Sequence, residues 1–300
     1  ALGPGRGGRM SRTPVFTACC WLCAALPVFV VAGLVFYLVR QSHPALGLSL
    51  FFGDTDPLAA LLRSAPVWDG IWPACVGTVG VVALAGLTAV PTGILAGVYL
   101  AEYASGWPGR ALSLCVDVLA GAPSILMGLF GFALILFLRH TLAPEANTSL
   151  LLSGACMGLL VLPYLINATA STLAALPGDL RLLGPSLGFT RWQAIRHILL
   201  PSAGRGIMSG VVLAIGRAAE DTAVIMLTGV VANAGLPRGL LDKYEALPFY
   251  IYTTAAEYHG PEELRRGFGA ALVLLALTTV LFLAAGALHR AMENRWRNGA

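Results

Sequence analysis

Long uncharged apolar runs constrain this chain more than any other feature. Windows without Asp, Glu, Lys or Arg cover residues 13–39, 70–101, 118–138, 146–178 and 267–288, and each is at least 21 residues long. A sixth apolar run, 206–237, is interrupted only by Arg217, Glu220 and Asp221. A helix needs about 20 apolar residues to cross a bilayer, and lipid requires each backbone group to be paired within the segment. The sequence therefore predicts an all-α integral membrane protein with about six transmembrane helices.

The low charge content supports the membrane assignment. Only 11% of the residues are charged, against about 25% in soluble globular proteins. The basic residues form no patch, so the net charge of +4 does not indicate a nucleic-acid partner; we expect membrane lipid instead. If the N-terminus is inside, eleven basic residues fall on the inner side and seven on the outer side. This bias predicts a multi-pass protein of the inner (plasma) membrane with both termini in the cytoplasm.

The apolar runs divide the chain into unequal parts. We expect residues 1–12 to be a disordered cytoplasmic N-terminus. Residues 13–39 are expected to be a retained transmembrane anchor, because their apolar run exceeds the roughly 7–15 residues of a secretory signal core. Residues 70–288 form the expected core domain, with a polar inner loop at 173–205. Residues 289–300 are the expected cytoplasmic C-terminus.

The third predicted span, 112–138, contains an interruption, Gly121-Ala122-Pro123-Ser124. Proline and glycine within a span are tolerated where neighbouring helices or a water-filled cavity satisfy the freed backbone groups. Broken helices of this kind are common beside transport pathways. A simple packing kink is the alternative interpretation.

No sequence feature indicates catalysis or a resident metal. The Cys20–Cys23 spacing is interpreted as small apolar helix residues, because the sequence contains no second ligand cluster. The five histidines are scattered, and the sequence has no G-x-x-x-x-G-K-[ST] motif, so it cannot itself be a P-loop ATPase. We predict that the chain is not an enzyme and holds no cofactor. If ATP drives it, a partner uses the ATP and Mg2+.

The inner loop at 173–205 is predicted to form two short amphipathic helices with a turn at Gly188. Ile198 and Leu199 fall on one helix face, away from Arg191. A short helix pair that projects from the membrane is a suitable docking site for a soluble partner. The alternative is a helix hairpin that rests on the lipid surface.

The same loop resembles the coupling loop of ABC importer permeases, the binding-protein-dependent transport permease family. The spacing of Gly188, nine residues, Ile198, one residue and Leu200-Pro201 matches the second half of that motif. The first half departs, because Leu182-Leu183-Gly184 replaces the family's Glu-Ala-Ala. Asp179 and Arg181 are the candidates for replacing the missing charge. The resemblance implies coupling to an ATPase through Gly188, Arg191, Ile198, Leu200 and Pro201.

Further motifs resemble the phosphate branch of this family, the PstA-type permeases. They include Pro91-x-Gly93-Ile94, Tyr99-Leu100-Ala101-Glu102-Tyr103, Leu187-Gly188-x-Thr190-Arg191-Trp192-Gln193 and Ala246-Leu247-Pro248, and the resemblance covers roughly residues 70–260. It implies a permease subunit of an ATP-driven phosphate importer. The implied partners are a PstC-like sister permease, a PstB-like ATPase dimer and a PstS-like extracytoplasmic phosphate-binding protein.

Three charges interrupt the fifth span, and charges inside a span are functional candidates because they are expensive there. Arg217, Glu220 and Asp221 stand at i, i+3 and i+4, so they are predicted to share one helix face. A guanidinium matches phosphate oxygens bidentately. The family reads Arg-x-x-Gly-Glu-Thr here, and the resemblance places Arg217, Glu220, Asp221 and Thr222 on the translocation path. The alternative is an ion cluster that neutralises itself and packs helices.

Two other functions stay open at this point. A permease of the same type for another oxyanion, such as molybdate or sulfate, would be distinguished by the ligand preference of its binding protein. A secondary transporter would need no ATPase, and its expected sign is an inverted internal repeat, which we do not find in the sequence. Co-purification with an ATPase subunit would separate the two mechanisms.

Overall fold

The computed structural model describes residues 14–63 and 66–298, and this part of the chain is almost entirely helical. Within it, the one contact of strand type is an isolated bridge between Val230 and Tyr244. Six of its helices are long and apolar enough to cross a membrane: Phe16–Ser42, Trp72–Tyr103, Ser124–Thr141, Leu150–Ala174, Arg191–Glu220 and Pro261–Ala287. The predicted all-α membrane fold with about six spans is confirmed.

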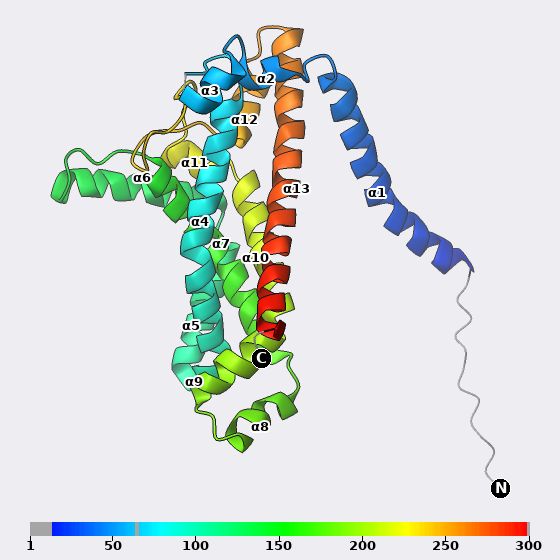
Figure 1. Ribbon diagram of the computed structural model, residues 1–300, viewed down its shortest axis with the longest axis vertical. Helices are drawn as coiled ribbons and strands as arrows, with labels where there is room; N and C mark the ends of the chain where they lie inside the picture. The colour runs from blue at the N-terminus through cyan, green and yellow to red at the C-terminus, as the bar shows by residue number, and fades with distance from the viewer. Residues whose placement is uncertain (1–13, 64–65, 299–300) are drawn as a thin grey trace.

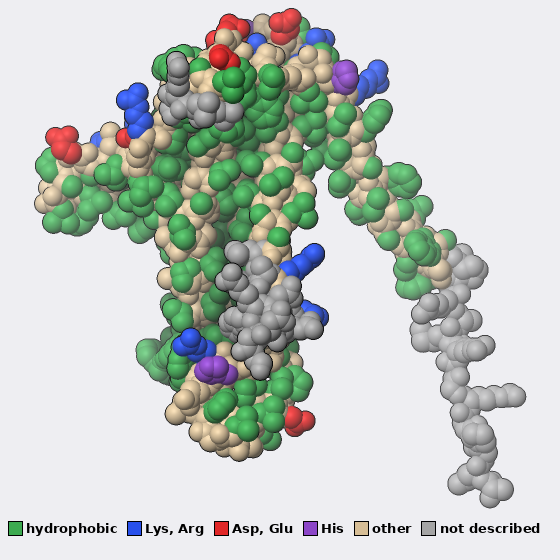
Figure 2. All heavy atoms as spheres, in the orientation of Figure 1, with side chains coloured by type: hydrophobic (Ala, Val, Ile, Leu, Met, Phe, Trp, Pro, Cys, Tyr) green, Lys and Arg blue, Asp and Glu red, His purple; other side chains and the backbone are tan. Residues whose placement is uncertain are grey.

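Four long helices form an upright bundle (Figure 1). They are α4 (Trp72–Val98), α7 (Leu150–Ala174), α10 (Leu200–Glu220) and α13 (Pro261–Asn298). α7 packs against both α4 and α10, and α13 packs against α10. Apolar side chains cover much of the outer surface of the bundle, whereas charged side chains lie mostly toward its ends (Figure 2). This distribution suits a protein whose middle is surrounded by hydrocarbon.

Glycine lets α4 and α7 approach each other closely. Gly93 and Gly97 of α4 face α7, and Gly154 and Gly158 of α7 face α4. A Cβ atom at Gly97 would lie 2.5 Å from the Cβ of Thr169, closer than real side chains come. Two of the small-xxx-small spacings in the sequence therefore mark a helix interface at which the backbones nearly touch. We call this interface the α4–α7 seam.

Short helices lie at the two ends of the bundle. At one end are α2 (Leu48–Phe52), α3 (Pro57–Arg63) and α12 (Leu247–Glu257), and at the other are α8 (Gly178–Ser186) and α9 (Arg191–Ala194) (Figure 1). α12 is tied to α4 because the Leu247 N–H donates to the buried Thr78 Oγ1 at 2.9 Å. The C-terminal part of α13 lies toward the α8–α9 end (Figure 1).

The third predicted span is two helices that run in different directions. α5 (Gly106–Gly121) packs against α7, whereas α6 (Ser124–Thr141) leaves the bundle sideways (Figure 1). Proline cannot donate a helical hydrogen bond and pushes the preceding residue into extended backbone. Ala122 accordingly has φ −69° and ψ 132° before Pro123. The predicted interruption is confirmed, but a single span over 112–138 is wrong.

The predicted anchor corresponds to α1 (Pro14–Ser42), which diverges from the bundle toward its N-terminal end (Figure 1). It contacts α13, and the rings of Tyr37 and Phe268 meet edge to face with centroids 5.8 Å apart. Trp21 and Phe29 expose 72% and 76% of their surface. Such a helix needs lipid or another protein around it, because large apolar side chains are unfavourable in water.

The structure describes most of one predicted chain end and none of the other. The expected disordered segment at 1–12 lies outside the described residues. Most of the expected tail at 289–300 is a continuation of α13, which stays helical as far as Asn298. The cytoplasmic location of both segments stays a prediction.

The variant Gly97→Ala tests the α4–α7 seam. Its methyl group would also lie 2.8 Å from the backbone oxygen of Ile166, so we expect a loss of about 1–3 kcal/mol through overpacking, measured as a lower Tm of the purified protein. The control is Gly86→Ala on the same helix, because a Cβ atom there meets nothing within 4 Å. Equal Tm values for the two variants would contradict a close backbone contact.

Candidate functional site

The coupling segment, residues 173–205, contains the hairpin that the sequence predicts. α8 and α9 are joined by a turn in which Gly188 has φ 71°, a backbone conformation that glycine adopts without strain. Thr190 and Gln193 form a reciprocal capping box that starts α9. The two short helices with a turn at Gly188 are confirmed.

The second helix of the hairpin continues further than predicted. α9 runs through a π-helical turn, η2 (Ile195–Leu199), directly into α10. A buried stripe, Ile195, Leu199, Ala203 and Ile207, continues from one helix to the other. This spacing of four residues keeps a single face toward the bundle and explains why the chain does not break. The fifth span therefore begins inside the coupling segment rather than at 206.

The buried stripe seats the coupling segment on the ends of α4 and α7. Its side chains pack with Val98 at the end of α4 and with Leu173 at the end of α7, all of them buried. The predicted coupling residues lie around this seat. Gly188, Arg191 and Pro201 are exposed, and Ile198 and Leu200 are half-buried.

Two arginines of the coupling segment contact the end of α4, which continues as a π-helical turn, η1 (Tyr99–Tyr103). The Arg181 Nη2 lies 3.0 Å from the Glu102 Oε1 and also donates to the Leu173 carbonyl oxygen at 2.9 Å. Arg191 donates to the backbone carbonyl of Glu102. We call Glu102, Arg181 and Arg191 the arginine clamp.

The arginine clamp includes one of the two residues proposed to replace the missing charge of the family motif. That charge is the glutamate of the family's Glu-Ala-Ala, which this sequence lacks. Of the two candidates for replacing it, Arg181 has a carboxylate partner, whereas Asp179 is exposed on α8. The contact of Glu102 was not predicted, because in the sequence this residue stands out only as part of the motif Tyr99-Leu100-Ala101-Glu102-Tyr103. A signal was present, because Glu102 is the first charged residue after the window 70–101 and stands where α4 ends.

Arg217, Glu220 and Asp221 do not share one helix face. α10 ends at Glu220, and Asp221 has extended backbone, with φ −75° and ψ 117°. The Asp221 Oδ1 accepts a hydrogen bond from the Val224 N–H at 3.0 Å, so Asp221 caps α11 (Ala223–Thr228). The predicted helical placement of Asp221 is wrong, because this capping bond competes with continuation of the helix. The predicted fifth span, in the apolar run 206–237, is likewise divided between two helices, α10 and α11.

The four predicted translocation residues nevertheless lie together at this break. Arg217 and Glu220 are exposed on the last turn of α10, and Asp221 and Thr222 are half-buried in the break. Within the described ranges, 14–63 and 66–298, no ion pair links Arg217 to Glu220 or Asp221. The arrangement therefore does not support the alternative of a cluster that neutralises itself.

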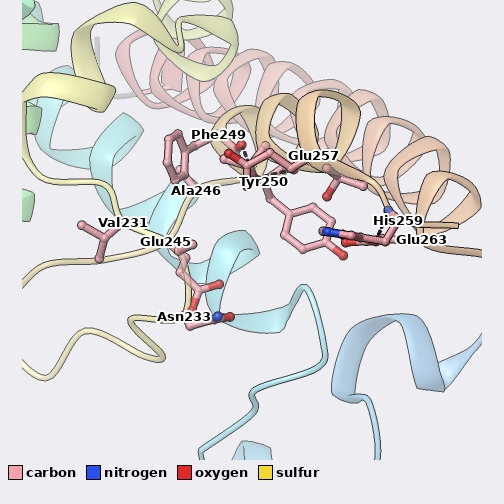
Figure 3. Close-up of a pocket in the computed structure, with 12 residues that line it drawn as sticks. Val231, Asn233, Glu245, Ala246, Phe249, Tyr250, Glu257, His259 and Glu263 are labelled. Carbon is pink, nitrogen blue, oxygen red and sulfur yellow. Dashed lines mark hydrogen bonds and ion pairs between the residues drawn. The ribbon is translucent and has the colours of Figure 1, made fainter.

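A cavity of about 240 Å³ lies at the other end of the molecule from α8 and α9, between α12, the start of α13 and the loop before α12 (Figure 3). Its lining includes three carboxylates, those of Glu245, Glu257 and Glu263. The Glu245 Oε1 accepts a hydrogen bond from the Gly235 N–H at 2.8 Å. Three carboxylates repel an anion, so this cavity is not an oxyanion site. Sequence analysis did not single out any of these residues.

Burial perturbs the carboxylate of Glu245. Only 8% of this residue is exposed, and desolvation raises the pKa of Glu245 above its ordinary value, while backbone N–H groups of Gly235 and Ala234 oppose that shift. An acid whose pKa is raised in the folded state contributes stability at low pH. This contribution is lost as pH rises through the folded pKa.

The chain belongs to the family described as "Binding-protein-dependent transport system inner membrane component", which matches residues 93–298. That range contains the coupling segment, the arginine clamp and the helix break at Asp221. The protein is thus a multi-pass membrane permease component, which is not itself a catalytic enzyme.

Two relatives that are similar in sequence are phosphate transport permease proteins, and one solved structure is similar in fold. The phosphate transport system permease protein PstA 1 of Mycobacterium tuberculosis is 35% identical over 231 residues, which cover 76% of this chain and 72% of that protein. PstA of Mycobacterium leprae is 36% identical over 234 residues, with coverage of 77% and 73%. A solved bacterial ABC transporter involved in import of the acidic polysaccharide alginate has a TM-score of 0.58 at 16% identity, covering 90% of this chain and 96% of that one. The last likeness shows a shared fold alone.

The variant Glu245→Gln tests the buried carboxylate. The amide oxygen still accepts the Gly235 N–H but carries no charge, so we expect a Tm about 2–4 °C higher near pH 8, a shift equivalent to roughly 1 kcal/mol in a chain of this size. The gain should shrink as pH falls toward the ordinary glutamate pKa of 4.5. Thermal unfolding of the purified protein between these pH values measures it.

The matched control is Glu257→Gln, an exposed carboxylate of the same cavity. We expect its Tm to follow the unsubstituted protein at every pH. A pH-independent gain for Glu245→Gln would show that packing rather than charge is responsible.

Proposed function

We propose that this chain is the membrane-spanning permease subunit of an ATP-driven phosphate importer and forms the translocation path together with a sister permease. The observation that carries the proposal is its 35–36% identity to two phosphate transport permease proteins over about three quarters of its length. The coupling segment and the charged helix break both fall within the shared family range. Together they supply the two parts that such a subunit requires.

The coupling segment is the proposed ATPase contact. Gly188 and Arg191 are exposed, and the helices on either side of the turn, α8 and α9, lie at one end of the bundle (Figure 1). The chain contains no P-loop motif, so in this proposal a PstB-like ATPase dimer binds ATP and Mg2+ and docks at this end. That end is then cytoplasmic, and both chain termini face the cytoplasm of an inner (plasma) membrane protein.

The opposite end faces the extracytoplasmic side in this proposal. A PstS-like phosphate-binding protein delivers its ligand there, and a PstC-like sister permease completes the pathway. α1 diverges from the bundle, α6 packs on α11 and α7 with one face only, and both helices expose large apolar side chains. Surfaces of this kind suit lipid and a second membrane subunit.

The helix break that follows Arg217 is the proposed point of contact with phosphate. Arg217 is exposed, its guanidinium provides several donors for phosphate oxygens, and a broken helix beside it is a feature of transport pathways. Glu220 and Asp221 oppose an anion, so the contact is weak and transient. Weak binding suits transport, because a tightly held ion cannot leave. In this proposal the soluble binding protein, rather than the permease, selects phosphate.

Reconstitution tests the function. Proteoliposomes that contain this chain, the sister permease, the ATPase and the binding protein should accumulate radiolabelled phosphate when ATP is supplied, and the ATPase should co-purify with this chain. Excess molybdate or sulfate should not compete. Uptake of either anion in preference to phosphate would assign the permease to another oxyanion, and ATP-independent uptake would assign it to secondary transport.

The variant Arg217→Gln tests the translocation path in the same assay. Hydrogen bonds to charged groups contribute about 1.5–3 kcal/mol, so we expect phosphate uptake to fall roughly tenfold or more. Arg217→Lys keeps the charge and should retain part of the uptake. Wild-type uptake by Arg217→Gln, at equal amounts of assembled complex, would remove Arg217 from the path.

A further inference from the structure

We propose that Glu102 is the positioning residue through which the coupling segment moves α4. The inference rests on the proposed function, because it assumes that the ATPase docks on α8 and α9. Glu102 belongs to neither of those helices. It lies on η1, at the end of the long bundle helix α4, and it is the carboxylate that Arg181 of α8 contacts.

The contact is an ion pair between a nearly buried carboxylate and a partly exposed guanidinium, since the Arg181 side chain is 38% exposed, and it is not an aligned hydrogen bond. The Glu102 side chain is 9% exposed and its Oε1 lies 3.0 Å from the Arg181 Nη2, yet that oxygen accepts no hydrogen bond from the described residues. The attraction therefore depends on distance more than on direction. Such a contact can persist while α8 tilts relative to α4, which a link between two moving parts requires.

One guanidinium holds two bundle helices at once. The same Arg181 Nη2 donates to the carbonyl oxygen of Leu173 in the last turn of α7. Carbonyl groups at a helix C-terminus lack intrahelical partners and carry partial negative charge, so a cation is favourable there. A displacement of α8 is thus applied to the ends of α4 and α7 together.

Arg191 strengthens the link from the second arm of the hairpin. It donates to the Glu102 backbone carbonyl, and its guanidinium carbon lies 4.6 Å from the centre of the Tyr103 ring. The hairpin therefore grips η1 from both sides of the Gly188 turn. η1 and η2 are both π-helical, and turns of this type occur frequently at functional sites in helices.

α4 can carry the displacement to the other end of the molecule. At the α4–α7 seam the two helices are in near backbone contact, because Cβ atoms at Gly93 and Gly97 would already collide with α7, so we expect them to move as a pair. At the far end, Thr78 of α4 accepts the Leu247 N–H of α12 at 2.9 Å. A rigid helix bonded at both ends is a contiguous route between the ATPase side and the cavity side.

The test is the amount of phosphate transported per ATP hydrolysed in the reconstituted complex. We expect Glu102→Gln and Arg181→Gln each to lower this ratio about tenfold, in the range typical of coupling between sites, while ATP hydrolysis continues. The double variant should be no worse than the worse single variant, because both remove the same link. Arg110→Gln is the control, since Arg110 lies on α5 and, among the described residues, bonds only to Gly106 of its own helix.

A purely structural role predicts a different result. At equal amounts of assembled complex, the variants would then lower ATP hydrolysis and transport together and leave the ratio unchanged, and this result overturns the proposal. If Arg181→Gln fails to assemble because the nearly buried Glu102 carboxylate is left unpaired, the double variant removes that charge and its ratio decides. A wild-type ratio in the double variant also overturns the proposal.

The outcomes separate this inference from the function on which it rests. If the unsubstituted complex hydrolyses ATP but imports no phosphate, the proposed function fails. If it imports phosphate and the clamp variants keep its ratio, only the role of Glu102 fails. If Arg110→Gln also lowers the amount of phosphate transported per ATP, then any charge change at this end of the molecule lowers it. That result also overturns the role assigned to Glu102.

Discussion

The close contact of α4 and α7 is the constraint on which the rest of the structure depends. Glycines on both helices replace side-chain packing with near contact of the backbones. In lipid no hydrophobic force drives helices together, so such close van der Waals contact is the main source of their association. The coupling segment, α10 and α12 all attach to this pair. The pair is therefore the frame that holds the two ends of the molecule in a fixed relation.

Charge is placed at the ends of this frame and at one break within it. The arginine clamp meets the C-terminal ends of α4 and α7, where helix dipoles favour cations. The acid-lined cavity occupies the opposite end. Between them, Arg217 follows a long apolar stretch of α10, and the chain leaves helical geometry four residues later. Arg217 therefore lies one turn before a break in the helix.

Patterns within one segment were readable from the sequence, and contacts between segments were not. The six apolar runs, the break before Ser124 and the turn at Gly188 each follow from local composition, glycine or proline. The sideways course of α6 does not, because a proline ends a helix without fixing the direction of the next one. The capping bond of Asp221 could not be predicted either. An aspartate four residues after Arg217 is compatible both with a shared helix face and with a cap.

The arginine clamp shows the same limit at longer range. Arg191 and Glu102 are 89 positions apart in the sequence, and only the packing of the coupling segment on the bundle brings them together. The motif spacing identified the coupling segment, which contains both arginines. It gave no information on which residue they contact. The sequence shows that the family's Glu-Ala-Ala is replaced. Only the fold shows which carboxylate Arg181 contacts, because that carboxylate comes from a different helix.

The separation of α1 from the bundle has a consequence for how the chain is made. Its main contacts are with α13, which the ribosome makes after all the other described helices. During synthesis α1 must therefore reside in the bilayer without its eventual neighbour, and its sequence has to be stable there on its own. The uncharged window 13–39 meets that demand, because every residue on every face is acceptable to lipid. The later helices enter a membrane that already contains a partner surface, and among them lie the α4–α7 seam and the charged break after α10.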